Sequence, residues 1–230
     1  MRPSHFFGKV TLHAEVAKLV DALRSGRSTR KGMEVRVLSS AQNNMELSNK
    51  PLITTARLLA YEAHASIWLK AENGDVCPHV VHLQEVADLV WASGGSDAEI
   101  AAAWLHDSVE DTALTNADIA LHCGDEVASL VHSLTDYDEW VKLPVLERKM
   151  LQAERIKNES ESVRRIKLCD QTSNVRGIAT SRPLSMTEGD CKEYAEGARR
   201  IVEGCKGISP MLEKLFEDAY AKAILRYGRI

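Results

Sequence analysis

The sequence predicts an all-α fold, and three observations support this. Apolar residues recur at helical spacing from Leu52 almost to the end of the chain. Some of these stretches begin at good helix-capping residues, and no run of alternating β-branched residues lies between hairpin turns. The 230 residues are 44% hydrophobic and 27% charged, which is enough apolar material for a buried core. We therefore expect a bundle of helices.

The first half of the chain is expected to contain three helices, because apolar residues there lie three or four positions apart. The residues that set the patterns are Leu58, Leu59, Ala63, Ile67 and Leu69 for the first helix, Val81, Val86, Leu89 and Val90 for the second, and Ile100, Ala103, Trp104 and Leu105 for the third. Ser96 and Asp97 are good cap residues at the start of the third helix.

Six further helices are expected after these. The fourth is capped by Thr115 or Asn116, continues through Ile119 and Leu121, and ends at Gly124. The residues that define the fifth are Val127, Leu130, Val131 and Leu134. Long charged stretches with helical spacing follow near 142–160, 162–180, 186–204 and 209–226.

Charge divides the chain into two parts. The 29 Lys+Arg and 33 Asp+Glu give a net charge of −4, but residues 1–44 hold eight basic and three acidic residues. Residues 45–230 therefore hold 21 basic and 30 acidic residues, a balance of −9. Such a change of sign is typical of two segments with different origins or tasks.

The basic segment admits several interpretations. An organellar transit peptide is weakened by its three acidic residues, and an arm that binds nucleic acid is weakened by the lack of interleaved aromatic residues. Residues 14–41 resemble the conceptual translation of a bacterial leucine tRNA gene, with Leu19–Ala22 matching the D-arm and Val35–Val37 the T-arm. We therefore expect residues 1–44 to be a non-native or disordered extension and residues 45–230 to form the working domain. An ordinary flexible extension is the alternative.

Composition also excludes some classes of protein. No apolar stretch approaches the roughly 20 residues that a membrane-spanning helix needs. The acidic balance argues against a nucleic-acid binder, which is usually basic. The five cysteines are odd in number and show no Cys-x-x-Cys spacing, which favours reduced thiols in the cytoplasm. The sequence specifies no oligomeric state.

The string His106-Asp107-Ser108-Val109-Glu110-Asp111 places one imidazole and three carboxylates directly after an apolar stretch. On a helix, His106 and Glu110 share one face, and Asp107 and Asp111 share another. Buried carboxylates this close repel each other unless a cation or protons compensate them. A divalent metal is one compensation; a solvated acidic helix end is the structural alternative.

Two other segments strengthen the metal interpretation. His82 lies at the entry of an amphipathic helix, and Asp170 follows an apolar stretch and precedes a polar face. A separate helix carries each of them and the His106-Asp107 pair, so the three segments can form a mixed nitrogen and oxygen site. Such a site without thiolate suits Mn²⁺, Fe²⁺ or Zn²⁺.

The order of these residues along the chain, a histidine, then a His-Asp pair, then a distant aspartate, resembles the motif of the HD-domain metal-dependent phosphohydrolases. The fuller pattern resembles one branch of that family, the hydrolase domain of the RelA/SpoT homologues and their small stand-alone relatives, which degrade the alarmone (p)ppGpp. The matching segments cover about residues 55–180 and include Ala63-His64, HLQEVA at 82–87, AAWLHDSVEDT at 102–112, GDEVASLV at 124–131 and IKLCDQTSNVR at 166–176. The resemblance implies a helical bundle around a single Mn²⁺ site.

The resemblance also assigns roles to residues of this chain. The metal ligands would be His82, His106, Asp107 and Asp170. Glu110 and Asp111 match the pair that positions and deprotonates the attacking water. Asn174 matches a residue that contacts the ribose, and Lys70 lies near the segment that meets the base and phosphates. The implied reaction is removal of pyrophosphate from the ribose 3′ position of (p)ppGpp or a similar small nucleotide.

Departures from the family concern the substrate more than the metal. The family usually has an Arg-Lys pair where this chain has Leu69-Lys70-Ala71, and a tyrosine where it has His79. Another HD nucleotidase or phosphodiesterase is therefore one alternative. A non-catalytic nucleotide sensor with a bound metal is another, against which Glu110 and Asp111 argue.

Other polar and aromatic residues carry less weight. We expect Arg148 and Lys149 to form a surface pair more readily than to meet phosphates. The remaining helical histidines, His64, His122 and His132, are expected to be packing or surface residues. The tryptophans Trp68, Trp91, Trp104 and Trp140 are expected in the core.

Overall fold

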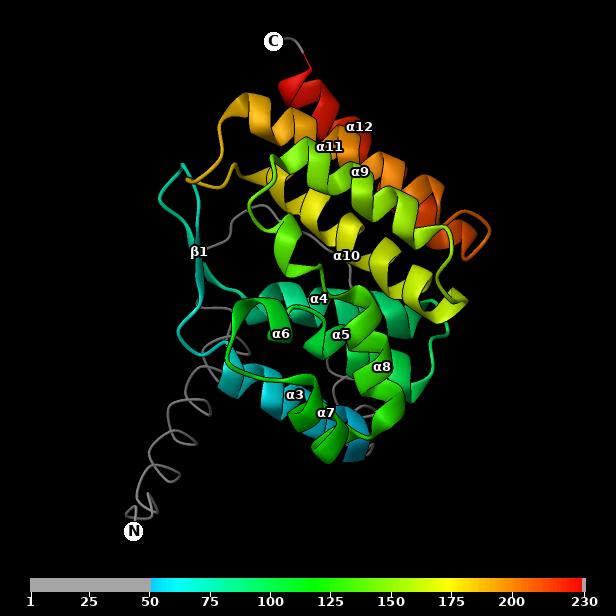
Figure 1. Cartoon of the computed structure of the whole chain (residues 1–230). Coiled ribbons are helices and arrows are strands. Elements are labelled where there is room, and N and C mark those ends of the chain that lie inside the picture. Colours follow the sequence, from blue (N-terminus) through cyan, green and yellow to red (C-terminus); the bar gives the residue numbers. More distant parts are fainter. Residues whose placement is uncertain (1–50, 229–230) are drawn as a thin grey trace. The chain divides into compact units, whose positions relative to one another are not determined.

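The computed structural model describes residues 51–228 (Figure 1). The interpretation of residues 1–44 as an extension, and of 45 as the start of a domain, concerns a boundary outside this range and stays a prediction. Across 51–228 no helix is both long and apolar enough to cross a membrane.

The fold is helical, as predicted, with one short β-hairpin. The helices are α3 (Pro51–Ala63), α4 (Val80–Ala92), α5 (Asp97–Leu105), α6 (Ser108–Asp111), α7 (Asn116–Cys123), α8 (Asp125–Leu134), α9 (Val145–Ile156), α10 (Glu161–Thr180), α11 (Glu188–Glu203) and α12 (Pro210–Tyr227). A 3-10 turn, η1, spans Asp138–Trp140, and the strands are β1 (Trp68–Lys70) and β2 (Val76–Pro78).

The caps explain why several helices begin where the sequence indicates. Ser96 accepts a hydrogen bond from the Glu99 N–H, and the Glu99 side chain accepts one from the Ser96 N–H. Thr115 and Asp118 form the same reciprocal pair at the start of α7. Such capping boxes satisfy N–H groups that the first turn of a helix leaves without partners. The prediction that Thr115 or Asn116 caps this helix is therefore confirmed for Thr115.

The first helix is shorter than the apolar spacing suggests. α3 ends at Ala63, and Leu69 pairs with Cys77 in the antiparallel hairpin of β1 and β2. Gly74 sits in the connecting turn with φ of 84°, a left-handed conformation that most residues avoid. The prediction of one helix as far as Leu69 was wrong, because the chain turns at residues 64–66 and then forms the hairpin, whose two strands are joined by the Asn73-Gly74 turn. Asn-Gly is a common turn signal.

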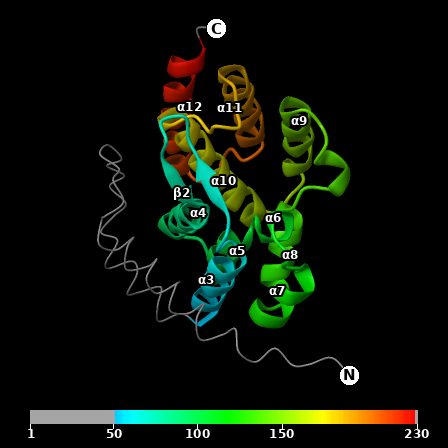
Figure 2. The same cartoon turned by 90° about the vertical axis from the view of Figure 1, so that its left-hand side faces the viewer.

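The hairpin lies along one side of the helices (Figure 2). Its turn residue Glu72 forms ion pairs with Arg182 at 2.8 Å and with Arg226 at 2.5 Å. Trp68 in β1 is 46% exposed, so its expected place in the core was wrong, whereas Trp104 is 2% exposed. The hairpin therefore rests on the helical core without supplying Trp68 to it.

The helices α3, α4, α5 and α8 form a first group, with α5 at its centre. All residues of α5 from Ala98 to Leu105 are buried, and this helix packs against α3, α4 and α8. The run Ala101-Ala102-Ala103 has small side chains, which lets neighbouring helices approach closely. His106 and Asp107 follow directly, so the best-packed helix of this group holds their backbone in place.

The helices α9, α11 and α12 form a second group, and α10 joins it to the first. α10 packs against α4, α5 and α8 on one side and against α11 and α12 on the other (Figure 1). Figure 1 shows α9 and α11 side by side above it. Ile166, Leu168 and Cys169 are completely buried within α10. The polar residues that follow Cys169 are therefore carried into the interior of the protein.

Substitution of Phe216 tests the packing of this second group. Phe216 in α12 is completely buried, so Phe216→Ala should lower the free energy of unfolding by about 3–5 kcal/mol. Urea denaturation followed by circular dichroism measures the change. Leu225→Ala in the same helix is the control, because Leu225 is 69% exposed and its loss should change stability by less than about 0.5 kcal/mol. Equal effects of the two substitutions would contradict the packing described.

Candidate active site

Four side chains predicted as metal ligands lie together. His82 lies in the first turn of α4, His106 and Asp107 follow α5, and Asp170 lies in α10. His82 Nε2 and His106 Nε2 are 3.3 Å apart. The Oδ1 atom of Asp170 lies 3.6 Å from His82 Nε2 and 3.8 Å from His106 Nε2. Asp107 Oδ1 is 3.2 Å from His106 Nε2, so nitrogen and oxygen donors converge on one small space.

Hydrogen bonds fix the orientation of both rings. His106 Nδ1 lies 2.8 Å from the carbonyl oxygen of Ala103, which can only accept, so Nδ1 donates. His82 Nδ1 lies 2.9 Å from Ser173 Oγ, and that hydroxyl donates in turn to Glu85 at 2.8 Å. The serine oxygen therefore accepts from His82 Nδ1. Both rings thus direct Nε2 into the space among the four side chains.

Two imidazole lone pairs at this separation repel each other unless a cation lies between them. The donors fit a divalent metal with nitrogen and oxygen ligands. In the metal-free protein, a proton on one of the two rings relieves this repulsion. Burial lowers the pKa of His82 to about 4, so this ring is neutral. Burial acts on His106 in the same direction, but the carboxylates of Asp107 and Asp170 outweigh it and raise the pKa of His106 to about 9.

Glu110 and Asp111 lie in the short helix α6, which directly follows His106 and Asp107. Glu110 Oε1 accepts a hydrogen bond of 2.6 Å from the backbone of Asp136, and the side chain of Asp111 is 46% exposed. Burial raises the pKa of Glu110, and burial followed by the charge of Asp107 raises the pKa of Asp111. Both carboxylates can therefore take up a proton more readily than free carboxylates can.

The two predicted substrate contacts differ in position. Asn174 follows Asp170 by one helical turn, and its amide donates to Asp170 Oδ1, so it borders the cluster. Lys70 is exposed in β1, where it pairs with Val76, and its carbonyl oxygen accepts a hydrogen bond of 2.8 Å from the Leu184 N–H. The structure therefore brings Asn174 to the cluster and leaves Lys70 on the hairpin surface.

The segment that carries this cluster is similar to a known protein family. A protein-family model described as an HD domain matches residues 56–190, which include all four clustered ligand candidates. The chain belongs to the HD-domain family. It is an HD-domain phosphohydrolase that depends on a divalent metal.

Relatives with curated functions support a narrower placement within the HD domains. The chain is 33% identical to guanosine-3′,5′-bis(diphosphate) 3′-pyrophosphohydrolase MESH1 of Xenopus tropicalis over 168 residues, 72% of this chain and 91% of that protein. It is 34% identical to the human protein of the same name over 145 residues, 62% of this chain and 79% of that one. A solved structure of a metazoan SpoT ortholog, described as hydrolysing ppGpp, superposes with a TM-score of 0.68 at 26% identity and covers 74% of this chain and 94% of that chain.

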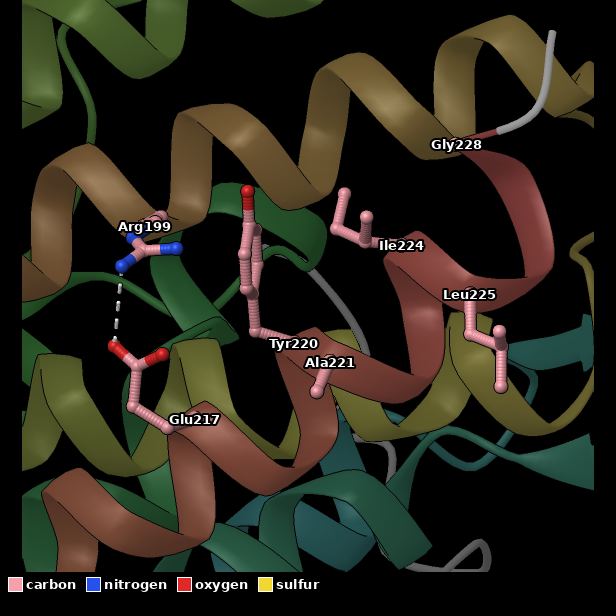
Figure 3. A pocket seen from close by; sticks show the side chains of 7 residues that line it. All are labelled: Arg199, Glu217, Tyr220, Ala221, Ile224, Leu225 and Gly228. Atoms are coloured by element: carbon pink, nitrogen blue, oxygen red, sulfur yellow. Dashed lines mark ion pairs between the residues drawn. The ribbon is translucent and has the colours of Figure 1, made fainter.

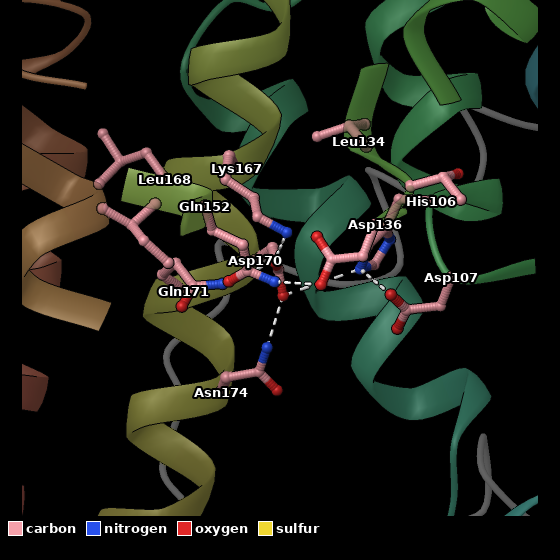
Figure 4. A network of polar contacts seen from close by, with 12 residues as sticks. His106, Asp107, Leu134, Asp136, Gln152, Lys167, Leu168, Asp170, Gln171 and Asn174 are labelled. Carbon is pink, nitrogen blue, oxygen red and sulfur yellow. Dashed lines mark hydrogen bonds and ion pairs between the residues drawn. The ribbon is translucent and has the colours of Figure 1, made fainter. Parts of the chain in front are cut away.

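Buried polar residues of this HD domain extend the cluster beyond the predicted set. Lys167 Nζ lies 3.1 Å from Asp170 Oδ2, and Gln171 donates to the same oxygen at 2.8 Å. Lys149 Nζ donates to Gln171 at 2.8 Å and lies 4.0 Å from the centre of the Tyr194 ring. Figure 4 shows Lys167, Gln171 and Asn174 around Asp170.

Lys149 was expected at the surface, and that prediction was wrong. It is 3% exposed, because α11 packs on α9 and Gly197 leaves room for the stem of the lysine. A Cβ atom at Gly197 would lie 2.6 Å from Lys149 Cβ. Burial, with the charge of Lys167, lowers the pKa of Lys149 to about 7. The residues next to Lys149 in the sequence gave no sign that its side chain is buried.

A shallow groove between α11 and α12 is a separate feature of this HD domain (Figure 3). Arg199 and Glu217 form an ion pair of 3.8 Å at one end of it, and Ile224 and Leu225 give it an apolar wall. None of the clustered histidines and aspartates lines this groove. The candidate active site is therefore the cluster and not the groove.

Proposed function

We propose that the chain removes pyrophosphate from the ribose 3′ position of guanosine-3′,5′-bis(diphosphate) or a similar nucleotide, with a metal held by His82, His106, Asp107 and Asp170. The observation that carries this proposal is the convergence of two imidazole Nε2 atoms 3.3 Å apart with two carboxylates. The curated activity of the MESH1 relatives supports the choice of substrate.

Manganese is the metal we propose, with Fe²⁺ or Zn²⁺ as substitutes. Two imidazoles and two carboxylates without a thiolate suit these ions better than Mg²⁺ or Ca²⁺, which prefer oxygen alone. When bound, such an ion lowers the pKa of a coordinated water and polarises a phosphoryl oxygen. The protein residues then have to orient this water and accept its proton.

Glu110 and Asp111 are proposed to orient the attacking water and to accept its proton. Burial raises the pKa of both carboxylates, which brings them nearer to the range where a general base works well. The hydrogen bond from the Asp136 backbone holds Glu110 in position.

Recognition of the nucleotide is proposed to involve Asn174 and Lys70. The carbonyl oxygen of the Asn174 side chain stays available while its amide group donates to Asp170, so it can accept from a ribose hydroxyl. Lys70 would meet the phosphates or the base from the hairpin. Lys167 adds positive charge behind Asp170, which helps the site to hold an anionic substrate.

A hydrolysis screen tests the proposed function. The chain, freed of metal by a chelator and resupplied with Mn²⁺, is incubated with ppGpp, pppGpp, NADPH and 5′-mononucleotides, and the products are separated by chromatography. Release of pyrophosphate from ppGpp supports the proposal. Turnover of mononucleotides but not of ppGpp would favour another HD nucleotidase, and no Mn²⁺-dependent turnover at all would favour a nucleotide sensor.

Ser173 is a positioning residue in this proposal. Its hydroxyl accepts from His82 and donates to Glu85, which also forms an ion pair with Arg176. Ser173→Ala should weaken Mn²⁺ binding by about 10- to 100-fold, because the His82 ring loses the partner that orients it. Isothermal titration of the metal-free protein measures the affinity.

A surface serine provides the control. Ser129→Ala in α8 removes an exposed hydroxyl of the same kind and should leave the metal affinity unchanged. A purely structural role for Ser173 predicts a lower unfolding temperature of the metal-free protein with no change in affinity. That result would remove Ser173 from the proposed site.

Metal binding should depend on pH because His106 carries a proton in the metal-free protein. Its pKa of about 9 means that a metal must displace this proton at any lower pH. The apparent affinity for Mn²⁺ should therefore rise about tenfold per pH unit from pH 6 to 8 and level off near pH 9. Titrations in buffers of different ionisation enthalpy count the released protons. An affinity that is constant over this range would contradict the proposed ligand set.

We also propose a cytoplasmic location. None of the five cysteines, all of which lie within 51–228, forms a disulfide, and four of them are buried. Proteins of oxidising compartments commonly use cysteines as disulfides, whereas reduced thiols are usual in the cytoplasm. Fractionation of the native cells with an antibody against the chain tests this location.

A further inference from the structure

A second group of potential ligands adjoins the first. His64 follows α3, His79 directly precedes α4, and Asp111 ends α6. Each offers one ligand atom, and these atoms lie within 4.8 Å of one another. The rings of His64 and His79 are 5.1 Å apart, and those of His79 and His82 are 5.3 Å apart. A row of imidazoles therefore continues from the first cluster to His64.

A buried nitrogen in this second group has no partner. His64 is 1% exposed, and its Nδ1 lies 3.0 Å from the carbonyl oxygen of Ala60. A carbonyl oxygen only accepts, so Nδ1 carries the hydrogen and Nε2 of the neutral ring carries a lone pair. This Nε2 has no hydrogen-bond partner among the residues described, and neither has Nδ1 of His79, which is 8% exposed. Buried polar atoms without partners are rare and need an explanation.

Asp107 lies between the two groups. Its Oδ1 atom faces His106 at 3.2 Å, whereas its Oδ2 atom lies 3.0 Å from His79 Nε2 and 3.6 Å from His82 Nε2. One carboxylate thus presents an oxygen to each group. Carboxylates that bridge in this way can hold two ions about 3.5–4 Å apart, as in two-metal phosphohydrolases.

We propose that His64, His79 and Asp111 form a second metal site, which shares Asp107 with the first. Two nitrogen and two oxygen donors would again suit Mn²⁺, Fe²⁺ or Zn²⁺. Ligands of one such ion are at most about 4.2 Å apart, so this group needs to close by only a few tenths of an ångström. The inference rests on the proposed function through Asp107, which both sites use. It also makes Asp111 a ligand in place of a proton acceptor, so Glu110 alone would then accept the proton of the attacking water.

The competing explanation gives His79 a smaller task. Its Nε2 could simply donate a hydrogen bond to Asp107 and orient that carboxylate for a single ion. This explanation leaves Nε2 of His64 without a function. It also predicts that one ion binds per chain, whereas the proposed second site predicts two, so the number of bound ions decides between them.

The experiment counts the ions on the full chain. Protein treated with a chelator is saturated with Mn²⁺ and passed through a desalting column, and its metal content is measured by mass spectrometry. Electron paramagnetic resonance then shows whether bound Mn²⁺ ions are magnetically coupled, as neighbours about 4 Å apart are. The variants are His64→Leu, which removes the buried lone pair, and Asp111→Asn, which alters a partly exposed ligand with little risk to folding.

Two bound ions with a coupled signal in the unaltered chain, and one ion without coupling in both variants, would support the second site. His122→Ala, which removes an exposed histidine, should keep both ions and serves as the control. One ion in the unaltered chain at saturating Mn²⁺ would overturn the second site while leaving the proposed hydrolase intact. No bound ion at all would overturn both.

Discussion

Asp107→Ala should abolish metal-dependent hydrolysis, with a fall in kcat/KM of about 10³-fold or more. Asp107 Oδ1 faces His106, and Oδ2 faces His79 and His82, so the substitution removes the carboxylate that most of the neighbouring imidazoles contact. Steady-state kinetics with ppGpp at a fixed Mn²⁺ concentration measure the loss. Titration of the same variant with Mn²⁺ should show weaker binding.

Asp125→Ala is the matched control for this variant. Asp125 is exposed at the start of α8, and its removal takes away the same charge from the chain. Circular dichroism establishes that both variants are folded. If Asp107→Ala retained more than a tenth of the activity at the same Mn²⁺ concentration, the proposed role of this residue as a ligand would be wrong.

Glu110→Gln should lower kcat by about 10²- to 10⁴-fold and leave Mn²⁺ binding unchanged. The glutamine keeps an oxygen that can accept from the Asp136 backbone, so the local structure should persist. It lacks the carboxylate that we propose to take the proton from water. The decisive measurement combines single-turnover rates with a metal titration of the same preparation.

Glu126→Gln in α8 makes the same change at an exposed site and should behave like the unaltered chain. Glu110 would be a ligand if the Glu110→Gln variant lost Mn²⁺ together with activity. Unchanged single-turnover rates would instead exclude it as the base. These outcomes separate loss of the metal from loss of proton transfer, which Asp107→Ala alone cannot do.

The helices were predictable because their signals are local. Capping residues such as Ser96 and Thr115 act within one turn, and the apolar spacing of α4 and α5 reflects faces that are in fact buried. The hairpin was missed because Ile67 lies four positions after Ala63 and so continues the helical spacing. The short Asn73-Gly74 signal was outweighed by this longer pattern.

The positions of the four ligand candidates were also predictable, because the motifs around them survive in family order. Contacts between residues that lie far apart in the sequence could not be predicted from such motifs. Lys149 is buried through Gln171 and Tyr194, which lie 22 and 45 positions away along the chain, and only packing of α9 against α11 reveals this. The sequence marks His79 only as a departure from the family pattern, because the distance from His79 to Asp107 depends on how α4 packs against α5.

The place of α10 between two groups of helices has a consequence for the lifetime of the protein. Asp170 comes from α10, whereas His82 and His106 belong to the group around α5, so an ion held by all three would cross-link the two groups. A ligand that binds only the native state stabilises it by mass action, by about 2.7 kcal/mol at one hundred times its Kd. Proteases cleave mainly unfolded molecules, and bound metal lowers their number. Degradation of the chain would therefore slow as the manganese concentration rises. Metal supply would then set the amount of the enzyme as well as its rate.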